Sequence, residues 1–124
     1  MIPQALIGTW IFTSMIYHGQ ILPPANPALK ISLQIETTAT DTMSYHHDGE
    51  TSFCERQARY SYQQGLLSQE VIWVNPNNAE WCSQDTDMQL GNHSVTPAWI
   101  ENQQLHLRFQ LGDDEVIYVW DLAH

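Results

Sequence analysis

The sequence predicts an all-β protein, an eight-stranded antiparallel up-and-down barrel with no large helix. Three observations favour this fold: apolar and polar residues alternate with a period of two, turn signals separate the alternating runs, and the connections are short. Short connections favour antiparallel neighbours, and closure removes the exposed edges of an open sheet. A β-sandwich is the alternative for the same strands. An eight-stranded barrel holds its own side chains or one small ligand.

Eight strand-like runs follow one another along the chain. They cover residues 6–17, 29–37, 42–47, 50–62, 66–74, 87–91, 94–100 and 104–122, the last being two strands if 87–91 is only a loop. Alternation is clearest in 29–36 and 104–111, where every second residue is Leu, Ile or Phe. Each of these runs is therefore predicted to have one buried and one solvated face.

Turn sequences separate the runs. Pro23-Pro24-Ala25-Asn26-Pro27 cannot lie in a central strand and is predicted to cross one open end of the barrel. Asp48-Gly49 is a hairpin dipeptide, and Gln64-Gly65 leads into the next run. Asn75-Pro76-Asn77-Asn78 ends the run 66–74, and Gly112-Asp113-Asp114 turns the chain into its last strand.

Length and charge restrict the class of protein. The 124 residues are predicted to form one domain, residues 1–124, and 43% of them are apolar, enough for a hydrophobic core. Fourteen acidic residues oppose four basic ones, and the formal charge of −10 repels nucleic acid and anionic lipid. No run of 18 apolar residues is present, so no membrane span is predicted.

The two cysteines, Cys54 and Cys82, lie beside strand-like residues and either form a disulfide or remain buried thiols. A disulfide would add about 3–4 kcal/mol of stability and indicate an oxidising compartment. The first 17 residues contain no Lys or Arg and do not resemble a signal peptide. The expected location is therefore the periplasm or the exterior if a leader was removed, and the cytoplasm otherwise.

Gly8-Thr9-Trp10 resembles the Gly-X-Trp signature of lipocalins and the wider calycin group. The segments 54–60, 73–76 and 81–82 are similar to small bacterial lipocalin-like proteins. The resemblance implies a lipocalin-like barrel in which Trp10 closes one end and the interior binds a small apolar ligand. The predicted last strand, 115–122, lacks the Arg that commonly stacks on this Trp in lipocalins. Avidins open similarly, which makes biotin binding a minor alternative.

The candidate ligand-binding residues are cationic or aromatic residues of the predicted strands: Arg56, Tyr60, Trp73, Trp99 and Tyr118. In a regular strand Arg56 shares a face with Cys54 and Tyr60, and from inside the barrel it would orient a carboxylate. Two other interpretations remain open: Arg56 lies on the outer face, or the aromatic residues fill the barrel completely. Burying ~200–300 Å² of apolar ligand would supply about 5–8 kcal/mol before association costs, which predicts micromolar binding.

No metal, cofactor or catalytic residue is predicted. His46 and His47 point to opposite faces of a strand and cannot readily chelate one ion, and a haem is not expected. Asp85-Thr86-Asp87 supplies oxygen ligands but lacks the pattern of a calcium-binding loop. Phosphate loops, dinucleotide fingerprints and hydrolase motifs are absent. A calycin-type enzyme would require a titratable cluster with perturbed pKa values inside the cavity.

The predicted function is therefore non-catalytic binding or carriage of a small apolar or amphipathic ligand inside the barrel, by a monomer or homodimer. The alternative is a protein-interaction or protease-inhibitor module with a filled barrel. This alternative follows from a similarity of outline to bacterial periplasmic metalloprotease inhibitors, which combine eight strands with one disulfide.

Overall fold

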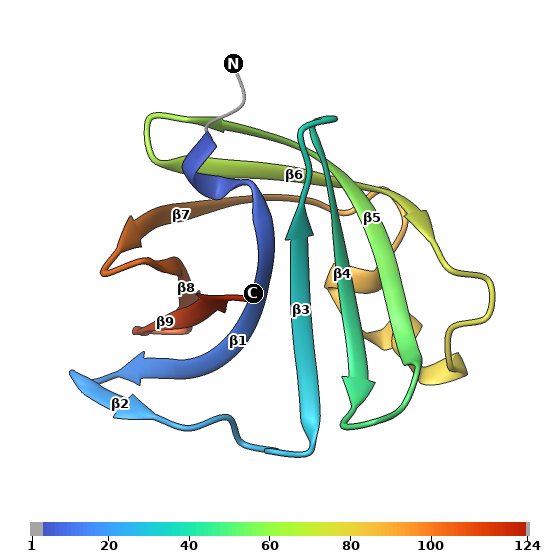
Figure 1. Ribbon diagram of the computed structural model, residues 1–124, viewed down its shortest axis with the longest axis horizontal. Helices are drawn as coiled ribbons and strands as arrows, with labels where there is room; N and C mark the ends of the chain where they lie inside the picture. The colour runs from blue at the N-terminus through green and yellow to red at the C-terminus, as the bar shows by residue number, and fades with distance from the viewer. Residues whose placement is uncertain (1–3, 124) are drawn as a thin grey trace.

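The alternating runs form strands of one antiparallel sheet that closes into a barrel, as the computed structural model shows for residues 4–123 (Figure 1). The predicted eight-stranded up-and-down barrel is confirmed. Its strands are β1 (Gly8–Tyr17), β3 (Leu29–Ile35), β4 (Thr40–His47), β5 (Ser52–Gln63), β6 (Leu66–Val74), β7 (His93–Glu101), β8 (Gln104–Leu111) and β9 (Asp114–Leu122). The remaining elements are a short strand, β2 (Gln20–Leu22), and three 3₁₀ turns, η1 (Gln4–Leu6), η2 (Glu80–Gln84) and η3 (Thr86–Met88).

The structure selects one of the two predicted divisions of the runs 87–91 and 104–122. Residues 87–91 form no strand, because they belong to η3 and the turn that follows it. The run 104–122 instead supplies two barrel strands, β8 and β9, which separate at Gly112. Gly112 has a φ of 62°, a left-handed conformation that glycine adopts without strain. The C-terminal run therefore provides the eighth strand of the barrel.

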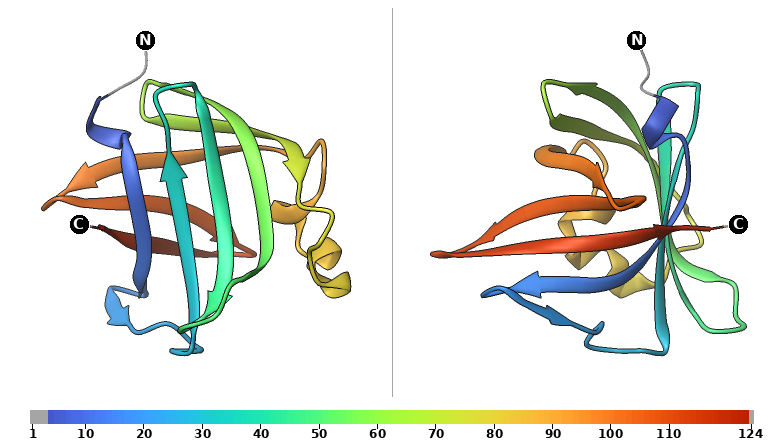
Figure 2. Two further views of the ribbon diagram at one scale, coloured as in Figure 1. Left: turned by 45° about the vertical axis from the view of Figure 1, so that its right-hand side comes forward. Right: turned by 60° about the vertical axis from the view of Figure 1, so that its left-hand side comes forward.

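The barrel closes through β1, which lies between β3 and β9. This strand pairs with β3 through Gly8–Ile11 and with β9 through Trp10–Tyr17. The register with β9 shifts between Phe12 and Ser14, a bulge that bends the strand from one partner toward the other. In both views of Figure 2, β3, β4 and β5 cross β7, β8 and β9 steeply. Residues from both groups of strands therefore face a common interior.

The barrel end beside η1 is closed by apolar side chains. Trp10 and Leu6 are both buried, and the indole Nε1 of Trp10 donates a hydrogen bond to the Leu6 carbonyl oxygen at 3.0 Å. Gly8 has a φ of 144°, and a Cβ atom at this position would lie 2.8 Å from Leu122 Cδ1 of β9. Only glycine therefore fits where β1 begins to pass β9. Trp10 and Leu6 belong to the hydrophobic core.

The segment 75–92 leaves β6, forms η2 and η3 beside β5, and returns to β7 (Figure 1). Cys82 of η2 forms a disulfide with Cys54 of β5, and their Cα atoms lie 5.8 Å apart. The predicted bridge is thus confirmed. Met88 of η3 is buried in the hydrophobic core of the barrel. The segment is therefore fixed to the barrel by one covalent link and one apolar anchor.

The side chains of β5 decide which face of this strand is interior. Cys54, Arg56, Ala58 and Tyr60 occupy alternate positions and are all buried. Arg56 therefore points into the barrel together with apolar neighbours.

No helix of residues 4–123 has the length and apolar character needed to cross a lipid bilayer.

Candidate ligand-binding site

A cavity of about 90 Å³ lies inside the barrel. This volume exceeds the ~15 Å³ that one water molecule requires and is smaller than an engineered cavity of ~150 Å³ that binds benzene. The cavity has room for a small molecule, or for one end of a longer molecule. Most of the remaining interior is filled by the side chains of the core.

One wall of the cavity is aromatic. Phe12 of β1, Phe109 of β8, and Tyr118 and Trp120 of β9 line it. The Phe12 ring centroid lies 5.2 Å from that of Tyr118 and 5.6 Å from that of Trp120, and Phe109 lies 5.0 Å from Tyr118. These tilted contacts are favourable for aromatic pairs. The wall therefore offers a continuous apolar surface to a ligand.

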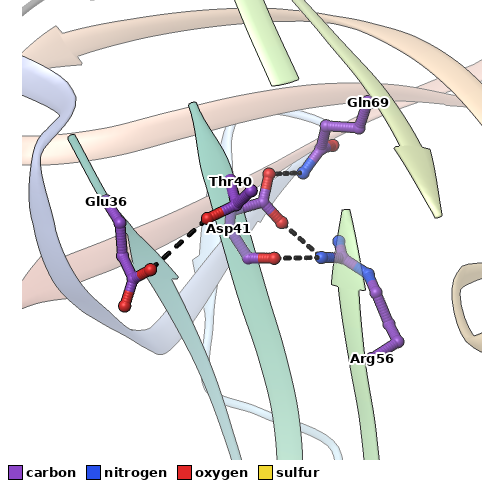
Figure 3. Close-up of polar contacts among 5 residues, drawn as sticks. All are labelled: Glu36, Thr40, Asp41, Arg56 and Gln69. Carbon is purple, nitrogen blue, oxygen red and sulfur yellow. Dashed lines mark hydrogen bonds and ion pairs between the residues drawn. The ribbon is translucent and has the colours of Figure 1, made fainter. Parts of the chain in front are cut away.

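The opposite wall contains a buried ion pair. Arg56 of β5 and Asp41 of β4 are 3% and 0% exposed, and Arg56 Nη1 donates to Asp41 Oδ1 (Figure 3). The same Nη1 donates to the Asp41 carbonyl oxygen at 3.3 Å, and Gln69 Nε2 of β6 donates to Asp41 Oδ2 at 2.9 Å. Burial of one charged residue alone would be highly unfavourable, so each depends on the other. The guanidinium charge is therefore compensated within the protein.

Hydrogen bonds of the β3–β4 turn stabilise the closed end of the barrel, next to the ion pair. Thr40 Oγ1 donates to Glu36 Oε2 at 3.3 Å (Figure 3), and the Tyr60 hydroxyl donates to the Glu36 carbonyl oxygen at 2.8 Å. Burial, and next the charge of Asp41, raise the pKa of Tyr60. Tyr60 consequently stays protonated at neutral pH and acts as a donor. Its hydroxyl is engaged by the backbone of the β3–β4 turn and does not line the cavity.

A second acidic group reaches the cavity from η3. The Tyr45 hydroxyl of β4 donates to Asp85 Oδ2 at 2.7 Å, and Asp85 Oδ1 accepts from the backbone N–H of Asp87 at 2.9 Å. Both Tyr45 and Asp87 line the cavity. Burial, followed by the hydrogen bond to Asp85, raises the pKa of Tyr45 far above its ordinary value. Burial and then the charge of Asp85 raise the pKa of Asp87, against the opposing effect of Arg56.

The structure brings two of the five candidate ligand-binding residues to the cavity. Arg56 and Tyr118 line it from opposite sides, whereas Tyr60 lies at the closed end. Trp73 is 41% exposed on β6, and Trp99 of β7 stacks on His106 with ring centroids 5.3 Å apart. Neither tryptophan lines the cavity.

Several residues at or beside the cavity were not predicted as site residues: Phe12, Asp41, Gln69 and Phe109. The period of two contained a signal for Phe109, because this residue lies on the same strand face as Leu107, which also lines the cavity. Asp41 lies one residue before the predicted strand 42–47, where an acidic residue is typical of a turn. In the antiparallel hairpin it is paired with Ala58 and is therefore a diagonal neighbour of Arg56.

The acidic loop and the histidines form no evident metal centre. Within residues 4–123, no three His, Cys, Asp or Glu side chains gather in a way that could hold a metal ion. Asp85 instead caps η3 and accepts the Tyr45 hydroxyl. His46 pairs with Ser52 across the β4–β5 hairpin, and His47 lies 3.4 Å from Glu50.

Two solved structures share the closed meander of this chain. A lipocalin-like protein from Bacteroides uniformis matches with a TM-score of 0.65 at 10% identity, covering 96% of this chain and 99% of that one. An uncharacterized protein from Bacteroides eggerthii matches with a TM-score of 0.61 at 9% identity, covering 94% and 98%. A fatty-acid-binding protein from Echinococcus granulosus has a TM-score of only 0.48, too low to support an argument.

No protein-family model matches the sequence, and no curated protein matches it. The structure defines the class: a closed, eight-stranded, up-and-down β-barrel with an internal cavity. Together with the Bacteroides uniformis structure, it shows that the fold is lipocalin-like. At about 10% identity this likeness establishes the fold alone.

Proposed function

We propose that the barrel binds a small apolar or amphipathic ligand in its interior, without catalysing a reaction. The observation that carries this proposal is the division of the cavity into an aromatic wall and a polar wall. Phe12, Tyr118 and Trp120 supply apolar contact, and Arg56 and Gln69 supply fixed polar groups opposite. Sites for small molecules typically combine an apolar lining with a few placed polar groups.

The size of the cavity sets the size of the ligand. About 90 Å³ suits a short chain or part of a single ring, and a larger ligand, a whole ring included, would extend through the mouth or displace side chains. We expect weak to moderate affinity, because a small ligand buries little apolar surface. The Cys54–Cys82 disulfide supports a periplasmic or extracellular location, where such bonds persist.

Ethylbenzene is a suitable first probe, and two neighbouring positions of β7 provide a matched pair of variants. Ser94 lines the cavity, whereas Val95 is 54% exposed on the outer face. We expect ethylbenzene to shift backbone NMR resonances of cavity residues in the wild type and in Val95→Phe. In Ser94→Phe the new ring occupies the cavity, and the affinity should fall at least tenfold. Absence of wild-type binding both to ethylbenzene and to a one-ring compound with a polar oxygen, or equal binding of ethylbenzene to all three proteins, would contradict the proposal.

A second candidate function is recognition of another protein. The observation that favours it is an exposed aromatic cluster outside the barrel: Trp81 is 55% exposed and packs on Phe53, with ring centroids 5.1 Å apart. Phe53 in turn lies 4.8 Å from the ring of His47. Native mass spectrometry of unreduced protein separates the two functions. A small co-purifying mass that is lost on denaturation favours ligand binding, and a co-purifying protein favours recognition of a partner.

A further inference from the structure

The charge of Arg56 is already neutralised before a ligand enters the cavity. Its Nη1 donates twice to Asp41, whose second carboxylate oxygen accepts from Gln69 (Figure 3). A carboxylate ligand would have to share this guanidinium with Asp41. Two carboxylates around one buried cation repel each other, and the second binds only weakly.

Further acidic groups lie beside the same cavity. Asp87 lines it, and Asp85 is the next acidic group along the chain toward η2. Burial and the charge of Asp85 raise the pKa of Asp87, as expected where negative charge is already crowded. The Arg56 guanidinium therefore lies near two carboxyl groups, those of Asp41 and Asp87, and Asp85 adds a third negative charge next to Asp87. Such surroundings disfavour an anion.

Two residues that line this cavity each have a buried side-chain hydrogen-bond donor without an acceptor. Among residues 4–123, Arg56 Nε and Trp120 Nε1 are the buried side-chain nitrogen atoms without a hydrogen-bond partner. Both residues line the cavity, Arg56 in the polar wall and Trp120 in the aromatic wall, and both are 3% exposed. Neither nitrogen can accept a hydrogen bond, so each requires an acceptor atom. Buried donors without partners are rare and require an explanation.

We infer that the ligand is an uncharged molecule whose apolar body carries a carbonyl or hydroxyl oxygen, rather than a free carboxylic acid. This inference rests on the proposed function of the same cavity. The oxygen accepts from Trp120 Nε1, and the apolar body lies against Phe12 and Tyr118. An uncharged oxygen satisfies a donor without adding an anion next to Asp41.

Three compounds of one ring test this inference on the complete chain. Acetophenone carries a neutral acceptor, benzoate carries an anionic one, and ethylbenzene has none. At pH 7 we expect acetophenone to bind about tenfold tighter than either of the others, the effect of one good hydrogen bond to a buried donor. In ¹⁵N-labelled protein, the Trp120 Nε1–H resonance should shift with acetophenone and respond little to ethylbenzene.

Variants identify the groups responsible for the selectivity. Trp120→Phe keeps an aromatic ring but removes the donor, and it should reduce the preference for acetophenone over ethylbenzene to less than threefold. Trp99→Phe, outside the cavity, is the matched control and should keep the preference. Asp41→Asn leaves Arg56 uncompensated and should raise benzoate affinity about tenfold. If a variant does not fold, the relative affinities of the wild-type protein for the three compounds still test the inference.

The outcomes distinguish this inference from the proposed function. Tighter binding of benzoate than of acetophenone, or equal binding of acetophenone and ethylbenzene, would overturn the inference and leave the binding function in place. Absence of cavity shifts with all three compounds would overturn both. A Trp120 indole resonance that responds equally to ethylbenzene and acetophenone would also overturn the inference.

Discussion

Reduction of the Cys54–Cys82 disulfide should destabilise the barrel by an amount that the loop length sets. The two cysteines are 28 residues apart, and the chain-entropy relation gives about 3.6 kcal/mol for a loop of this length at 25 °C. A typical domain unfolds with only 5–15 kcal/mol, so the change is large. It should be accompanied by faster amide exchange in the segment 75–92, because Cys82 is its covalent link to β5.

Urea unfolding of the oxidised and reduced wild-type protein measures this difference without changing a side chain. With a denaturant slope of about 1–3 kcal/mol/M, the midpoint should fall by roughly 1–3 M. The double variant Cys54→Ala with Cys82→Ala is the control, because reductant should leave its midpoint unchanged. A loss below about 1 kcal/mol would refute the reasoning, since it would mean that the bridge hardly restricts the unfolded chain.

Three further predictions concern the closed end, the acidic group of η3 and the ion pair. Trp10→Phe should lower the free energy of unfolding, measured in urea, by about 2–3 kcal/mol, because the Leu6 carbonyl loses its donor and the core loses volume. The affinity of this variant for ethylbenzene should stay within about twofold of wild type. A larger loss of affinity would contradict the location of Trp10 outside the cavity. The pKa of Asp87 is raised above its ordinary 3.8, so its contribution to stability is fully present below pH 3.8 and is lost as the pH rises through the raised pKa. Asp87→Asn should therefore be more stable than wild type at pH 7 and lose this advantage near pH 3; Asp113→Asn on the exposed β8–β9 turn is the control substitution. An advantage of Asp87→Asn that persists unchanged at pH 3 would contradict this cause. Asp41→Leu and Arg56→Met should each lower the free energy of unfolding, measured in urea, by about 3–5 kcal/mol, whereas the double variant should be about as stable as the wild type. A double variant as unstable as the single variants would contradict the mutual dependence of the pair.

The sequence was sufficient to predict the barrel because its strongest signals are local. Leu33 and Ile35 are buried at alternate positions of β3, as the period of two predicts, and Gly112 separates β8 from β9 as a turn residue should. The run 87–91 was ambiguous because Met88 and Leu90 occupy alternate positions; in the structure Met88 is buried from a 3₁₀ turn and Leu90 is 67% exposed, so the run is not a strand. The short β2 was missed because it forms only three register pairs with β1.

The cavity was harder to predict because neither face of β5 is apolar throughout. Alternation placed Arg56 on the same face as Cys54 and Tyr60, but it could not show that this face is interior. Tertiary contacts settle the choice: the bridge to Cys82 and the ion pair with Asp41 both lie on the inner side. Asp41 and Arg56 are 15 residues apart and meet through the register of the β4–β5 hairpin. Composition and spacing along the chain contain no such register.

The buried ion pair is better explained by selectivity than by stability. Apolar residues of similar volume often replace a buried pair without loss of stability, so packing alone does not require Asp41 and Arg56. Their arrangement affects which ligands the cavity accepts, because the Arg56 guanidinium lies at the cavity wall while its positive charge is neutralised by Asp41. The formal charge of −10 acts in the same direction over longer distances by repelling anions from the whole molecule. In the proposed function, the local and the global electrostatics thus both disfavour anionic ligands, and loss of the pair in the double variant should reduce that selectivity while the fold persists.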